Sequence, residues 1–331
     1  MLDTEGSGDR TALSYAFRPL TKNKYVSKRD DGSVSILAKG RALFPKVTPL
    51  ISVGGGVAER RRVMEVSRMA ALMERYGIVC TDHLMKGCRP HFIPSARWRD
   101  IAPGILSTTR FTGMLVAGKH RLAVYDIGDG TMEWQVRAEG SLFYTRYGSY
   151  ETKATGMLLV CHEENRVKAA QNIIRQTMWS RKQLLRDNCV ERNKPTKWSR
   201  SPIKMKAQYE HVYLTTPSRL FQSFKEIWDE EYYITYLCDK NDGIQPGSMG
   251  IGEDVQAWPR RLFVNSACDL LKYVRFFSAV KTQLELTKGR EYYQERTEME
   301  IYIHEEDTPI VMMYPEMQEL EEVTVCVYRS E

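Results

Sequence analysis

The segment Leu20–Lys46, LTKNKYVSKRDDGSVSILAKGRALFPK, reads as two short β-strands on either side of a tight turn. Tyr25–Ser27 leads into the Asp-Asp-Gly sequence at 30–32, and Val34–Leu37 leads out of it. An Asp-Gly pair between alternating segments is a strong hairpin signal, because Asp and Gly adopt the positive φ angles that tight hairpin turns need. The segment therefore predicts a two-stranded antiparallel ribbon.

Basic side chains crowd this predicted ribbon, and such a ribbon suits contact with nucleic-acid phosphates. A second basic block, residues 166–206, mixes cations with aromatic rings, as surfaces that stack on exposed bases do. The hairpin resembles the wing of a winged-helix DNA-binding domain. The residues that we predict to bind DNA are Lys22, Lys24, Lys28, Arg29, Lys39, Arg41, Arg181, Lys197 and Trp198.

The composition is that of a globular protein, with 42% hydrophobic and 27% charged residues among 331. That length favours about two domains. The chain has no run of eighteen apolar residues, and its first residues are acidic and polar, so we expect neither a membrane partner nor a signal peptide. Seven scattered cysteines, an odd number, favour reduced thiols in the cytoplasm over a disulfide framework.

The charge is distributed unevenly along the chain. The formal net charge is only +6, but residues 1–62 and 166–206 are rich in Lys and Arg, whereas the last 40 residues are acidic. One part of the protein is then expected to face an anionic polymer while another stays clear of it. The alternative interpretation is a set of solvated surfaces that cluster by chance.

The apolar pattern predicts an α/β fold, in which strands and helices alternate from 110 to 228 around a partly parallel sheet. No internal repeat is evident. The predicted strands are 110–116, 121–127, 155–161, 211–215, 298–304, 309–313 and 323–328. The predicted helices are 11–21, 57–76, 132–147, 165–185, 217–228 and 266–282.

The sequence Leu37-Ala38-Lys39-Gly40-Arg41 after the ribbon is similar to the L-x-K-G-R segment of the replication-relaxation family of plasmid proteins. The resemblance covers roughly residues 12–185, in layout. It implies a winged-helix-like DNA-binding segment at 1–50 and an α/β domain at 51–230. That domain would have a restriction-endonuclease-like mixed sheet with flanking helices. A C-terminal α+β extension would follow at 231–331.

Active members of the endonuclease-like fold need an Asp on one strand of a hairpin and Glu-x-Lys on the next, because the two carboxylates bind Mg²⁺. The corresponding hairpin is RFTGMLVAGKHRLAVYDIG, residues 110–128. Its first strand has no carboxylate, and its second has Asp126 without a Lys two positions later. The resemblance therefore implies a domain that binds without cutting. A rearranged Mg²⁺ site would have to use Asp126, Asp129, Glu133 and Glu139.

Two other patterns are weaker. Cys80, His83, Cys88 and His91 have zinc-like C-x2-H spacing, but loop residues without a metal are the favoured interpretation, and we expect no metal or other cofactor. Cys161 and His162 suggest a nucleophile and a base, but neighbours on a strand point to opposite faces, so the two could pair only in an irregular bend of the chain.

These observations favour a DNA-binding accessory protein of a plasmid or mobile element, acting in replication, mobilisation or transcription control. Other proteins of such a complex are expected partners. Two alternatives stay open. One is an interaction scaffold without nucleic-acid binding, and the other is a Mg²⁺-dependent nuclease.

Overall fold

A computed structural model describes residues 17–28, 34–43, 57–85, 90–102, 110–118, 120–128, 154–174, 211–228, 245–246, 260–265, 267–287, 298–314, 317 and 323–328. The chain divides into two compact units, Met1–Gly77 and Ile78–Glu331. Among the described helices, none has the length and apolar content needed to cross a membrane.

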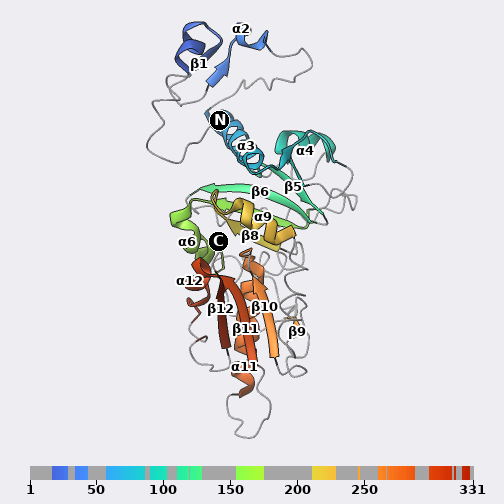
Figure 1. Ribbon diagram of the computed structural model, residues 1–331, viewed down its shortest axis with the longest axis vertical. Helices are drawn as coiled ribbons and strands as arrows, with labels where there is room; N and C mark the ends of the chain where they lie inside the picture. The colour runs from blue at the N-terminus through green and yellow to red at the C-terminus, as the bar shows by residue number, and fades with distance from the viewer. Residues whose placement is uncertain are drawn as a thin grey trace, which may run out of the picture. The chain divides into compact units, whose positions relative to one another are not determined.

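The first unit contains the predicted ribbon. Strands β1 (Val26–Lys28) and β2 (Val34–Ile36) pair antiparallel, with Ser27 opposite Ser35 (Figure 1). The hairpin prediction is confirmed, although its turn lies outside the described residues. A helical segment at 17–22 precedes the ribbon. The two helices that follow the ribbon are α2 (Ala38–Arg41) and α3 (Val57–Arg75).

The second unit is built on a six-stranded mixed sheet with the order β3-β4-β5-β6-β7-β8. Strands β4, β5 and β6 pair antiparallel, whereas β6, β7 and β8 run parallel. Helices α4 (Ser95–Ile101), α6 (Arg166–Asn172) and α9 (Leu220–Trp228) flank it (Figure 1). The strands are β3 (Val79–Cys80), β4 (His91–Pro94), β5 (Gly113–Ala117), β6 (His120–Gly128), β7 (Gly156–Cys161) and β8 (His211–Thr215).

A second sheet of the same unit has four parallel strands in the order β12-β11-β10-β9. Helices α11 (Leu270–Thr287) and α12 (Thr308–Val311) connect its last three strands. The strands are β9 (Gln245–Pro246), β10 (Arg260–Asn265), β11 (Glu298–His304) and β12 (Val323–Tyr328).

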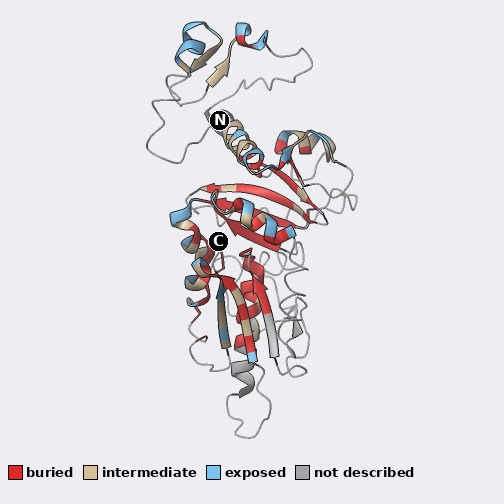
Figure 2. Cartoon of the chain, viewed as in Figure 1, coloured by how far each residue is buried: buried red, intermediate tan, exposed pale blue. Residues whose placement is uncertain are grey.

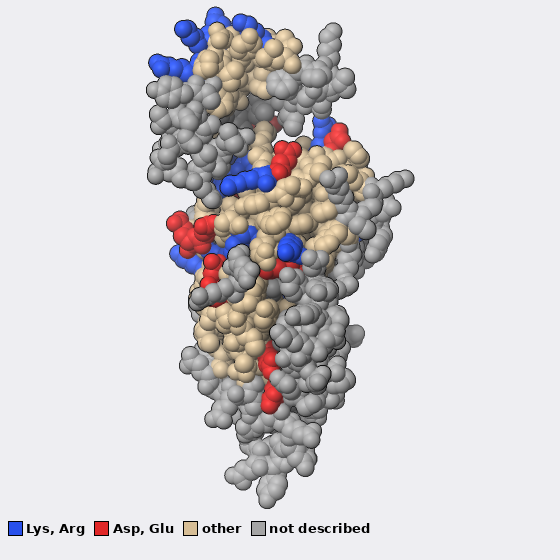
Figure 3. Space-filling model, viewed as in Figure 1, with Lys and Arg blue, Asp and Glu red and all other residues tan. Residues whose placement is uncertain are grey.

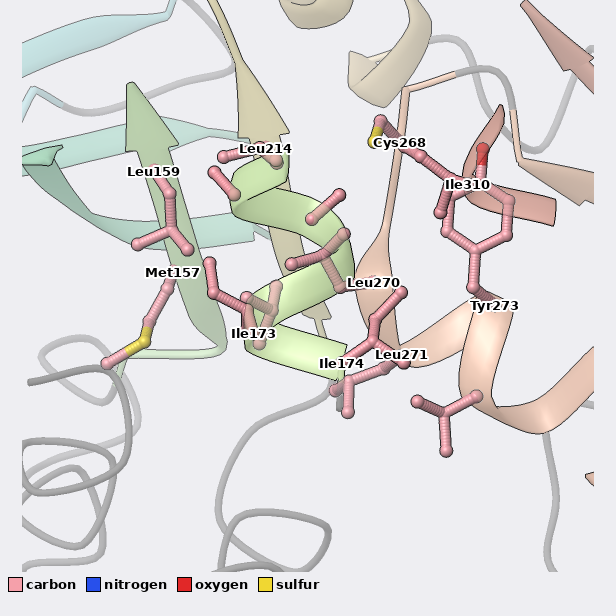
Figure 4. Packing of buried hydrophobic residues seen from close by; sticks show 14 of the residues in the cluster. Met157, Leu159, Ile173, Ile174, Leu214, Cys268, Leu270, Leu271, Tyr273 and Ile310 are labelled. Carbon is pink, nitrogen blue, oxygen red and sulfur yellow. The ribbon is translucent and has the colours of Figure 1, made fainter. Parts of the chain in front are cut away.

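One hydrophobic cluster includes inward residues of both sheets. Every residue of β7 is buried, and β11 alternates between buried and less buried positions, with Met299, Ile301 and Ile303 fully buried (Figure 2). Figure 4 shows Ile173 and Ile174, at the end of α6, between Leu159 of β7 and Leu271 of α11. The two sheets of this unit therefore share a single core.

The predicted α/β class is confirmed as a mixed sheet with flanking helices. The predicted strand at 309–313 is wrong, because the segment forms α12 with Pro309 in its first turn, where a missing N–H costs nothing. The sequence analysis missed β3, β4 and β10, which are short or bounded by loops. The predicted helix at 132–147 lies outside the described residues.

A local repeat, which the sequence analysis did not identify, relates the two sheets. The sequence His-Glu-Glu-Asn at 162–165 directly follows β7, and His-Glu-Glu-Asp at 304–307 begins at the last residue of β11. The two histidines have nearly equal backbone angles, φ −65° and ψ 144° for His162 and φ −68° and ψ 144° for His304. In both cases a 3-10 turn and then a helix follow. Each turn follows the middle one of three parallel strands, which is β7 in β6-β7-β8 and β11 in β10-β11-β12.

Asp269 joins β8 to the start of α11. Its buried carboxylate accepts the N–H groups of Val212 at 3.1 Å and Leu271 at 2.9 Å, and the ring N–H of His211 at 2.8 Å. Burial opposes its charge, but the His211 hydrogen bond and nearby cations outweigh burial and hold the pKa of Asp269 at about 2, below the ordinary 3.8. The carboxylate thus caps α11 and fixes β8 in the same place.

We predict that replacing Asp269 by Asn destabilises the second unit by about 2 kcal/mol near neutral pH, the free energy that the depressed pKa represents. A depressed folded pKa stabilises above the unfolded value and loses its effect as pH falls. The difference between wild type and D269N should therefore shrink between about pH 4 and pH 2. Urea unfolding at several pH values measures it, and a difference that does not change with pH contradicts this assignment.

Candidate functional site

The ribbon segment, defined as residues 17–28 and 34–43, is a concentrated patch of positive charge. It has no Asp or Glu among its described residues, and all six of its cationic side chains are exposed. Figure 3 shows only blue charged side chains over this segment (Figure 3). The six are Arg18, Lys22, Lys24, Lys28, Lys39 and Arg41.

Gly40 of the L-x-K-G-R sequence packs α2 against the ribbon. Gly40 is buried, and a Cβ at this position would meet the carbonyl oxygen of Tyr25 and lie 2.8 Å from Cγ2 of Ile36. The same Tyr25 carbonyl accepts the N–H of Leu37 at 2.8 Å, and Lys39 lies over the Tyr25 ring at 4.8 Å from its centroid. The backbone of α2 therefore comes so close to Tyr25 that only Gly fits at position 40. This packing places Lys39 and Arg41, which belong to α2, beside the two strands.

The structure brings together five of the nine residues predicted to bind DNA, namely Lys22, Lys24, Lys28, Lys39 and Arg41. Arg18 belongs to the same patch but was not predicted to bind DNA, because it lies in the predicted helix at 11–21, before the ribbon. The other four predicted residues, Arg29, Arg181, Lys197 and Trp198, lie outside the described residues.

The hairpin of β5 and β6 contains one carboxylate among its described residues, Asp126 near the end of β6. One oxygen of Asp126 accepts the N–H of Gly128 at 3.2 Å, which shapes the end of the strand where its register with β7 shifts. Asp129, Glu133 and Glu139 lie outside the described residues. The part of the hairpin that is described thus offers one acid.

The zinc-like pattern is divided between different local structures. The ring of His83 is 2.8 Å from the carboxylate of Asp82, whereas Nε2 of buried His91 accepts the N–H of Met85 at 3.3 Å. Cys88 is outside the described residues, and within the described ranges no three metal-ligating side chains come together.

Cys161 and His162 lie in different environments. Cys161 is buried, its thiol contacts the carbonyl of Thr215 at 3.5 Å, and burial raises the pKa of that thiol to about 12. His162 is exposed. His162 lies just beyond the end of β7, and the buried, high-pKa thiol of Cys161 lacks the features of a reactive cysteine.

A buried charge cluster lies at the carboxyl ends of β7, β8 and β11, and sequence reasoning missed it. Arg166 at the start of α6 forms an ion pair with Asp307, and the two side chains are 4% and 0% exposed. Arg219, just before α9, reaches the same acid at 3.7 Å and Glu306 at 3.2 Å. The two arginines come from the first sheet and the two acids from the second, so the cluster joins the sheets.

Glu226 of α9 extends the cluster. Its Oε1 accepts the hydroxyl of Tyr328 at 2.7 Å and the amide of Gln222 at 2.9 Å. Burial raises the pKa of Glu226, despite these two hydrogen bonds and the charge of Arg219. Burial therefore disfavours the charged form of this carboxyl group beside the arginines.

The one sequence signal for this cluster is the repeated His-Glu-Glu-Asn/Asp. Polar residues directly after buried parallel strands gather at one edge of a sheet, where α/β proteins place their sites. Comparisons of the chain with protein-family models, with curated proteins and with solved structures found no match.

We predict that replacing Gly40 by Ala weakens the ribbon by about 1–3 kcal/mol, because the added methyl group displaces the Tyr25 carbonyl. Amide hydrogen exchange at Leu37, whose N–H bonds to that carbonyl, should accelerate about tenfold or more. Ala42→Gly, at an exposed position of the same segment, is the control and should change the Leu37 rate far less. Unchanged exchange in G40A would contradict the packing argument.

We predict that Asp307→Ala destabilises the second unit by about 3–5 kcal/mol, since it leaves the Arg166 guanidinium buried without its partner. The double variant Arg166→Met/Asp307→Leu should recover most of the loss, because it removes both charges. Guanidinium unfolding measures both variants. A single variant as stable as the double would show that the pair does not join the sheets.

Proposed function

We propose that this protein binds duplex DNA through the ribbon segment. The observation that carries the proposal is the set of six exposed cations on the described part of one small ribbon, in a segment (residues 17–43) whose sequence has seven Lys and Arg against two Asp. Cations clustered in this way displace condensed counterions from a phosphate backbone, and this release supplies most of non-specific affinity. A two-stranded ribbon also has the dimensions to enter a major groove.

The ribbon suits this role because its cations are exposed, and of the six only Lys39 is described in contact with the ribbon's own packing, over the Tyr25 ring. Lys22, Lys28 and Arg41 are exposed, whereas Tyr25, Ile36 and Gly40 supply the local packing. Phosphate contacts need cations on a pre-formed support and position a protein on the duplex. We also propose that the ribbon contacts DNA as the wing of a winged-helix domain does.

The proposed biological role is that of an accessory protein in replication, mobilisation or transcription control of a plasmid or mobile element. It rests on the similarity of Leu37–Arg41 to the replication-relaxation family, together with the packing of Gly40. In this proposal the mixed sheet is a nuclease-like domain that supports binding, and other proteins of the complex are partners. The proposed setting is the cytoplasm, where DNA and free thiols such as Cys161 and Cys268 both occur.

The test is fluorescence-anisotropy binding of labelled duplex DNA over a range of salt concentrations. We predict that Lys28→Gln/Arg41→Gln weakens binding and lowers the slope of log K against log salt by up to about 2, one phosphate contact for each cation. Lys168→Gln/Lys225→Gln removes the same charge from exposed positions of the second unit and is the matched control.

Equal binding by the two double variants would show that net charge, and not the ribbon, governs affinity. Absence of binding by the wild type at low salt would overturn the proposal and favour an interaction scaffold. Mg²⁺-dependent cleavage of the duplex that Asp126→Ala abolishes would favour a nuclease.

A further inference from the structure

The buried charge cluster of the second unit has an unequal pair of acids. Asp307 is fully buried, whereas the side chain of Glu306 is 57% exposed. One oxygen of Glu306, Oε2, lies 3.2 Å from Nη1 of Arg219 and 3.8 Å from Nη1 of Arg166. Two guanidinium groups therefore meet at one carboxylate oxygen that is close to solvent.

The two arginines stand where a cation is unfavourable without an anion. Arg166 is the first residue of α6, and Arg219 directly precedes the nine-residue helix α9. Two guanidinium groups that are largely withdrawn from water and share one acid, Asp307, need negative charge close to them. Asp307 balances one positive charge from inside the protein, and Glu306 balances the other from the surface.

Each guanidinium group also has a buried N–H donor without a hydrogen-bond acceptor among the described residues. The Nε atoms of Arg166 and Arg219 are buried and donate to no described residue, although the Arg166 side chain is only 4% exposed. Buried donors of this kind are normally satisfied by protein, water or a ligand. The ring of His304 lies beside the same acid: its Nδ1 accepts the N–H of Glu306 at 3.3 Å and is 3.9 Å from Oε2 of Glu306.

We propose that Arg166 and Arg219 form a binding site for a phosphate group, and that the Glu306 carboxylate is a tethered stand-in which this ligand displaces. Arginine forks match the oxygens of phosphate in paired hydrogen bonds, which a single carboxylate oxygen satisfies only in part. Displacement of Glu306 leaves two guanidinium groups against Asp307, a net charge of +1 that favours an oxyanion. The proposal does not depend on DNA binding by the ribbon.

The test is calorimetric titration of the whole protein with inorganic phosphate, at constant ionic strength set with sodium chloride. An internal competitor raises the apparent Kd by the inverse of the fraction of open sites. Glu306→Gln should therefore bind phosphate about tenfold more tightly, the factor expected if Glu306 occupies the site nine-tenths of the time. Glu164→Gln changes the equivalent acid of the repeated turn and should bind as the wild type does.

Arg219→Lys keeps the charge but loses the fork, and should weaken phosphate binding in the Glu306→Gln background. A second titration compares a 5′-phosphorylated oligonucleotide with an unphosphorylated one of the same sequence, so that the two differ only in the terminal phosphate. A preference for the phosphorylated strand that grows in E306Q identifies a nucleic-acid end as the ligand. Tightening for inorganic phosphate alone identifies a free phosphate.

Absence of a phosphate effect in both the wild type and E306Q would overturn the proposal, as would equal tightening in E306Q and E164Q. E306Q is expected to fold, because its side chain is half exposed, and thermal unfolding without phosphate verifies this. If E306Q is strongly destabilised and phosphate does not restore it, the cluster is a contact between sheets and nothing more.

Discussion

The buried ion pair between Arg166 and Asp307 is the constraint that links the two sheets of the second unit, because neither charge can be removed without leaving the other buried and unpaired. The side chains of Arg166, after β7, and Asp307, after β11, are in contact and are both withdrawn from water. A buried ion pair of this kind is stable only if both partners are held in place. The turns after these strands hold the two partners. They have nearly equal backbone angles at His162 and His304, and they place Arg166 at the start of α6 and Asp307 directly before α12.

The two units use charge in opposite ways. In the first, the cations are exposed and the packing around Gly40 and Tyr25 is local, so charge can be changed without loss of the fold. In the second, charge is buried, and the acids of one sheet neutralise the arginines of the other. Surface cations suit a polymeric anion such as DNA, whereas a buried pair of arginines suits one small oxyanion.

The sequence predicted the elements with strong local signals. The ribbon followed from its Asp-Gly turn, and β7 followed from an unbroken apolar run. The strand prediction for 309–313 was wrong because it was based on the apolar run alone, although Pro309 is also typical of the first turn of a helix. The charge cluster was not predicted, since Arg166 and Asp307 are 141 positions apart and Arg166 looked like one more member of a basic block.

The most direct test of the account is hydrogen exchange of the whole chain with and without duplex DNA, followed segment by segment. We expect protection to appear in residues 17–28 and 34–43, because the ribbon contacts the backbone of the duplex. The slow exchange of the core strands β7 and β11 should stay unchanged. Protection confined to residues 78–331, or no protection at a DNA concentration that saturates binding, would contradict the assignment of DNA binding to the ribbon.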